Sequence, residues 1–86
     1  MKPLEIKGAR ARLGLSQQYM ADTLGISVHS YRKKESGKIK FADEEKVLVT
    51  KVLNFTVEQM NDYLYDGLLP IGDGISFRQT SVKTDV

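Results

Sequence analysis

The sequence predicts a small all-α domain of five helices with a short irregular C-terminal tail. Five stretches within residues 4–65 place apolar residues at helical spacing, and capping residues or glycines bound most of them. Strand patterns are scarce, since only Ile75 and Phe77 alternate briefly with polar neighbours. We therefore expect one domain over residues 1–66 and a tail over residues 67–86, either flexible or a dimer arm.

The first predicted helix covers Leu4–Leu13. Pro3 suits a first helical turn, where a missing N–H costs nothing, and Gly14 suits the residue after the last turn. Helical spacing places three apolar residues on the inward face: Ile6, Ala9 and Leu13.

The next two helices are short and separated by a tight turn. Ser16 is a candidate N-cap for a helix over residues 17–24, and Gly25 ends that helix in a left-handed conformation. Ser27 then caps a third helix that runs to about Glu35. Apolar side chains are expected to hold the two helices together, namely Met20, Leu24, Ile26 and Tyr31.

The fourth and fifth helices also have clear boundaries. Acidic residues at Asp43, Glu44 and Glu45 favour a helix start, because they complement the helix dipole. Thr56 with Gln59 forms a capping box that opens a fifth helix reaching about Tyr65. The predicted apolar face of the fourth helix contains Val47, Leu48, Val52 and Leu53.

Composition excludes several classes of function. The chain has no cysteine and one histidine, which excludes disulfides, thiolate metal sites and a His-rich metal site within one chain. No apolar run approaches the roughly 20 residues of a membrane span, and the N-terminus lacks the apolar core of a secretory signal. No nucleophile–base pairing is visible. We expect no enzyme activity, catalytic residue, metal, cofactor or membrane partner, and a cytoplasmic location.

Charge is distributed unevenly along the chain. Residues 1–40 contain nine Lys or Arg and three Asp or Glu, whereas residues 41–86 contain four and eight. A basic half on a chain of net charge +2 is compatible with a face that binds a polyanion. It is also compatible with two ordinary solvated faces.

The segment from Gln17 to Gly37 carries the most information. Two short helices around a Gly-Ile-Ser turn are the physical recipe of a DNA-binding helix-turn-helix. With its surroundings, this segment resembles the lambda-repressor/Cro-like (Xre-type) helix-turn-helix family over about Ile6 to Leu64. The resemblance rests on Arg10, Gly14-Leu15-Ser16-Gln17, Ala21, Leu24-Gly25-Ile26-Ser27, Tyr31, Glu35-Ser36-Gly37-Lys38 and Leu53-Asn54-Phe55-Thr56.

The resemblance implies that the third helix enters the major groove of double-stranded DNA. Four residues share its outward face and are expected to contact bases: Val28, His29, Arg32 and Lys33. Two alternatives stay open, because Val28 also suits core burial and Arg32 also suits phosphate. Expected phosphate contacts are Arg10, Gln17, Ser27, Lys38 and Lys40.

Two further positions bear on the fold that the resemblance implies. Arg10 and Glu35 match positions that often pair in this family. Lys34 departs from the family, which more often has an apolar residue there, and its stem is expected to cover that surface while its head reaches water.

The expected function is therefore sequence-specific DNA binding by a phage or mobile-element repressor, acting as a homodimer on operator DNA. The alternative is an antitoxin or anti-repressor that binds a partner protein as well as DNA. The expected dimer interface contains Tyr63, Leu64, Leu68, Leu69 and Ile71.

Overall fold

The computed structural model of this 86-residue chain describes residues 1–70. Within that range the chain forms five α-helices and no strand, which confirms the all-α prediction and the number of helices. The helices are α1 (Pro3–Arg12), α2 (Gln17–Leu24), α3 (Val28–Glu35), α4 (Asp43–Leu53) and α5 (Val57–Leu64).

Side-chain caps set three of the helix starts. Ser16 Oγ accepts from the N–H of Tyr19, and Ser27 Oγ accepts from the N–H of Ser30. Thr56 completes the predicted capping box, because its hydroxyl accepts from Gln59 N while the Gln59 side chain accepts from Thr56 N. Left-handed residues end α2 at Gly25 and α4 at Asn54.

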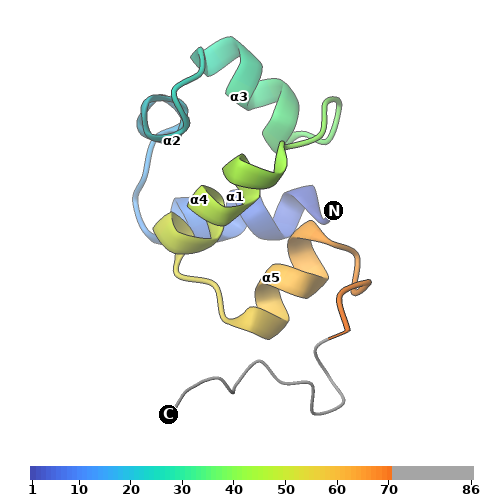
Figure 1. The fold of residues 1–86 in the computed structure, drawn as a ribbon. Helices are drawn as coiled ribbons and strands as arrows, with labels where there is room; N and C mark the ends of the chain where they lie inside the picture. Colours follow the sequence, from blue (N-terminus) through green and yellow to red (C-terminus); the bar gives the residue numbers. More distant parts are fainter. Residues whose placement is uncertain (71–86) are drawn as a thin grey trace, which may run out of the picture.

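The five helices surround one core. In Figure 1, α3 and α5 lie at opposite ends of the domain, with α1 and α4 between them and α2 beside α3. α1 contacts both α3 and α5, and α2 contacts both α3 and α4. The buried apolar side chains come from all five helices and from the α3–α4 link: Ile6, Ala9, Met20, Ala21, Tyr31, Phe41, Val49, Leu53 and Leu64.

Two predicted core positions are wrong. Leu13 is 51% exposed, because α1 ends at Arg12 and the chain turns away at that point. Val47 is 48% exposed, whereas its neighbour Val49 is fully buried with Leu53 one turn later. Because α4 contains a run of apolar residues, the sequence pattern alone did not show which of them face the core.

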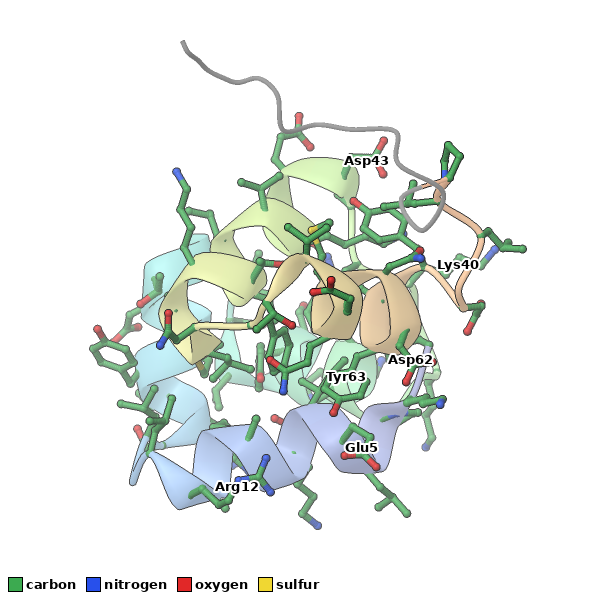
Figure 2. The ribbon with its side chains drawn as sticks, turned by 90° about the horizontal axis from the view of Figure 1, so that it is seen from below. Glu5, Arg12, Lys40, Asp43, Asp62 and Tyr63 are labelled. Carbon is green, nitrogen blue, oxygen red and sulfur yellow. The ribbon has the colours of Figure 1, made fainter. Side chains whose placement is uncertain are left out.

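The N-terminal residues bind along α5. Lys2 donates its backbone N–H to the carbonyl of Tyr63 at 2.8 Å, and its Nζ lies 3.0 Å from the carboxylate of Asp62. Figure 2 views the molecule from below, and there Asp62 and Tyr63 lie on the side of α5 that is next to α1. The Asn61 side chain, within α5, donates to the carbonyl of Leu69 and accepts from its N–H, and Leu69 lies beyond the end of α5. These contacts hold both ends of the described chain against α5.

The turn between α2 and α3 should depend on glycine. Gly25 has φ +72°, and a Cβ there would meet nothing within 4 Å, so only backbone strain opposes a side chain. We expect Gly25→Ala to lower the free energy of unfolding by about 1–2 kcal/mol, measured by urea denaturation. The matched control is Gly8→Ala inside α1, whose Cβ would meet only the flexible end of Arg12. This control should raise stability by about 0.5–1 kcal/mol. Equal effects of the two substitutions would contradict the strained-turn assignment.

Candidate nucleic-acid interface

The two sides of α3 differ completely in exposure. His29, Arg32 and Lys33 are exposed, as expected for residues that share an outward face. Tyr31 is fully buried and Glu35 is 3% exposed on the inward side. The helix therefore presents a polar, basic surface to solvent while its other side is fixed in the domain.

Val28 differs from the other three residues of the predicted base-contact set. It is half-buried at the start of α3 and packs against the core cluster. Of the two alternatives for this residue, the packing favours a core role for most of its surface. Only the remaining exposed part is available to a ligand.

Glu35 is the centre of a hydrogen-bond network that joins three helices. Its carboxylate accepts from Arg10 of α1 through Nε at 2.7 Å and Nη2 at 3.3 Å. It also accepts from Gln17 Nε2 of α2 at 3.0 Å and from the Tyr31 hydroxyl at 2.7 Å. Four donors thus satisfy a carboxylate that is almost fully removed from water.

The network shifts the ionisation of its members. Burial alone would raise the pKa of Glu35, but the hydrogen bonds from Arg10, Tyr31 and Gln17 outweigh it and lower the pKa below the usual 4.5. Burial, together with the hydrogen bond to Glu35, raises the pKa of the Tyr31 hydroxyl, which stays protonated as a donor. The pKa of Arg10 is raised by its hydrogen bond to Glu35. Glu35 is therefore an anion at neutral pH, with Arg10 as its counter-ion.

The geometry corrects the expectation that Arg10 contacts phosphate. Its side chain is 12% exposed, its Nε and Nη2 bind Glu35, and its Nη1 donates to the carbonyl of Leu15 at 2.8 Å. The predicted Arg10–Glu35 pair is confirmed. Because the pair uses the guanidinium, Arg10 is a structural residue.

Gln17 and Arg32 are linked to each other at the edge of the outward face. Arg32 Nε donates to Gln17 Oε1 at 3.1 Å, while Gln17 Nε2 donates to Glu35. The Gln17 side chain is therefore occupied at both ends. Sequence reasoning missed this link, because the two residues are fifteen positions apart and their spacing carries no signal.

The remaining predicted phosphate contacts divide into two kinds. Lys38 and Lys40 are exposed in the link between α3 and α4. Ser27 is exposed too, but its hydroxyl caps α3 and donates to Ser30 Oγ at 3.1 Å. The two lysines are thus available to an anion, while Ser27 also caps α3 and its phosphate contact stays a prediction.

Lys34 does not extend its head into water as expected. Its Nζ lies 2.6 Å from Glu45 at the start of α4, and both side chains are mostly buried. Glu45 also accepts from the N–H of Ala42, and these two hydrogen bonds outweigh its burial and lower its pKa. The pair fixes the second flank of α3 to α4. Its partner was not predictable from local spacing, since the ion pair joins residues eleven apart.

The predicted dimer residues have different environments. Leu64 is 3% exposed in the core, so its assignment to the interface is wrong. Leu68 is 80% exposed, Tyr63 and Leu69 are half-buried, and Ile71 lies outside the described residues.

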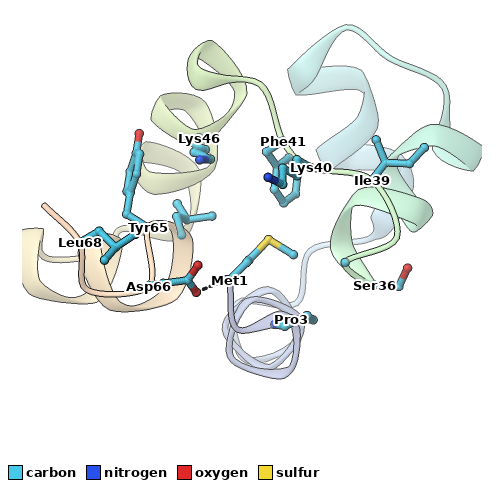
Figure 3. Close-up of a pocket in the computed structure, with 12 residues that line it drawn as sticks. Met1, Pro3, Ser36, Ile39, Lys40, Phe41, Lys46, Tyr65, Asp66 and Leu68 are labelled. Atoms are coloured by element: carbon cyan, nitrogen blue, oxygen red, sulfur yellow. Dashed lines mark hydrogen bonds and ion pairs between the residues drawn. The ribbon is translucent and has the colours of Figure 1, made fainter.

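Leu68 borders a hollow of about 500 Å³ that lies between the α3–α4 link and the end of α5, beside the N-terminus. Met1, Phe41 and Tyr65 line it together with Ile39, and Figure 3 shows these side chains around it. Two lysines, Lys40 and Lys46, lie on its wall, and Lys46 Nζ stands 4.3 Å from the centre of the Tyr65 ring. Asp66 and the terminal ammonium group of Met1, which form an ion pair, also line the hollow, so its apolar side chains lie among four charged groups.

The acid stability of the protein should report the charge on Glu35. Because its folded-state pKa is lowered, its contribution is fully present above the unfolded value of 4.5 and is lost as pH falls through the folded value. We expect Glu35→Gln to lower the free energy of unfolding by about 3–5 kcal/mol at pH 7. The difference in free energy of unfolding between the variant and the parent should become steadily smaller below pH 4.5. Urea denaturation at several pH values measures both, with the exposed Glu58→Gln as control.

No family model, curated protein or solved structure matches this chain. Among residues 1–70, no helix has the length and apolar character needed to cross a membrane. In the same range no three His, Asp or Glu side chains gather into a group able to hold a metal ion. A functional assignment therefore rests on the sequence pattern and on the geometry around α3.

Proposed function

We propose that this chain is a sequence-specific DNA-binding regulator of the lambda-repressor/Cro-like type, which binds operator DNA as a homodimer. The observation that carries the proposal is the division of α3 into two sides. Tyr31 and Glu35 anchor one side, while His29, Arg32 and Lys33 are exposed on the other. A rigidly held helix with an exposed basic face is what major-groove recognition requires.

The chemistry of the exposed residues supports base readout. Lys33 donates hydrogen bonds and suits the O6 and N7 acceptors of guanine. His29 suits a purine N7, and the exposed part of Val28 suits a thymine methyl group. Val28 and His29 lie in the first turn of α3, the part of a recognition helix that meets base edges, and Lys33 lies in the last turn on the same side.

Charge on the neighbouring link supports backbone contact. Lys38 and Lys40 are exposed directly after α3, so they extend the basic surface beyond the recognition helix. Lysines at such positions neutralise phosphates and fix the register of a helix in the groove.

A homodimer supplies the contacts that one small module lacks. One α3 meets only a few base pairs, and two copies reading half-sites about 34 Å apart give useful specificity. Exposed Leu68, at 80%, and Ile39, at 44%, border the same hollow and supply apolar area for such an interface.

Selection from a random duplex library tests the function. We expect an enriched site with two similar half-sites. At that site Lys33→Ala should cost about 1–3 kcal/mol and relax specificity at one base pair, because it removes a base contact. Lys40→Ala should weaken all duplexes alike, because it removes a phosphate contact.

The control for both variants is Lys51→Ala, an exposed lysine in the last turn of α4, which leads toward α5. It should leave affinity unchanged. A chain that enriches no sequence and binds no duplex at low salt would refute the proposed function. Uniform loss in both Lys33→Ala and Lys40→Ala would refute base reading by α3.

Sedimentation tests the dimer. We expect Leu68→Glu to raise the dimer dissociation constant about tenfold or more, because a leucine in an interface is replaced by a charge. Leu13→Glu is the matched control, since Leu13 is also exposed but lies at the far end of α1. Monomeric parent protein, or equal effects of the two substitutions, would contradict dimerisation through the Leu68 end.

A further inference from the structure

A second hollow, of about 380 Å³, lies where α1, α2 and α3 meet, and it shares Pro3 and Ser36 with the first. Its polar lining consists of Lys7 from α1, Gln17 from α2, Arg32 and Glu35 from α3, and Ser36 after α3. We name it the α1–α3 hollow. It adjoins the exposed face of α3, since Arg32 belongs to both.

Arg32 is held at this hollow in a defined way. Its Nε donates to Gln17 Oε1 at 3.1 Å, and Gln17 is itself held by its donation to buried Glu35 at 3.0 Å. Within residues 1–70, both terminal Nη groups of Arg32 keep their hydrogens free to donate. The hydrogen bond to Gln17 thus holds the Arg32 guanidinium near the start of α2. The two Nη groups of Arg32 are left at the rim of the hollow.

The net charge at the hollow is positive. Glu35 faces it, but Arg10 Nε at 2.7 Å and Nη2 at 3.3 Å already neutralise that carboxylate. Lys7 is exposed, and no carboxylate lies within ion-pair distance of it among the described residues. Arg32 and Lys7 therefore present two uncompensated cations, one of them a fork suited to two oxygens of a phosphate.

We propose that the α1–α3 hollow seats one backbone phosphate of the bound duplex, with Arg32 and Lys7 as its ligands and Gln17 as the residue that positions Arg32. The inference rests on the proposed function and deepens it. It assigns Arg32 to the DNA backbone and leaves base reading to its neighbour Lys33. It also assigns a phosphate contact to Lys7, which had no role in the sequence analysis.

Salt dependence of duplex affinity tests the two ligands. A dimer seats two phosphates in its two hollows, so Lys7→Ala and Arg32→Ala combined should make the slope of log affinity against log salt less negative by about 1.8, and each single substitution should give part of that change. Each should weaken the selected site and an unrelated duplex by the same factor. Lys51→Ala is again the control and should leave the slope unchanged.

The positioning role of Gln17 has its own readout. Gln17→Ala removes no charge, so the slope should stay within about 0.5 of the parent value. Affinity should nevertheless fall about 2- to 10-fold, the range of one net hydrogen bond. NMR relaxation should show that the Arg32 Nε–H group is more mobile in this variant than in the parent. An unchanged Arg32 resonance would refute the positioning role.

Two outcomes separate this inference from the proposed function. If Arg32→Ala relaxes specificity at one base pair and leaves the slope unchanged, Arg32 reads a base and the inference is wrong while DNA binding stands. If the chain binds no duplex, a titration with pyrophosphate decides. Shifts of the Arg32 Nε and Gln17 Nε2 resonances would support the anion site and refute only DNA binding. Unchanged resonances would refute the anion site as well as DNA binding.

Discussion

The buried carboxylate of Glu35 is the constraint on which the rest of this small domain depends. It is a charge taken out of water, so it must be matched where it lies. Its partners come from three different helices: Arg10 from α1, Gln17 from α2 and Tyr31 from α3. Satisfying one anion therefore fixes the mutual placement of those helices.

Gln17 links the buried Glu35 to the surface, because its Nε2 donates to Glu35 and its Oε1 accepts from the exposed Arg32. On the opposite flank the pair between Lys34 and Glu45 joins α3 to α4. α3 is thus held by polar contacts on both flanks and by Tyr31 in the core. If α3 binds DNA as proposed, a helix held in this way loses little conformational entropy on binding.

Local chemistry made much of the fold predictable. Ser16, Ser27 and Thr56 cap helices where the sequence placed them, because a cap is decided within three residues. The residues of α4 that face the core could not be identified from local sequence, because its apolar run is compatible with more than one buried face. Packing against the other helices buries Val49 and Leu53. At the candidate site the Arg10–Glu35 pair was expected from family resemblance. The Gln17–Arg32 and Lys34–Glu45 contacts were not, since long polar side chains choose partners only after the helices pack.

The division of α3 into an anchored and an outward side also bears on how such a protein can change. Substitutions at exposed His29 and Lys33 leave the Glu35 network untouched, and exposed positions of this kind usually alter stability by less than about 0.5 kcal/mol. Most sequences randomised at these two positions would therefore still fold. Under the proposed function, the domain is a scaffold in which new DNA specificities are reachable by single steps, without a compensating repair of the core.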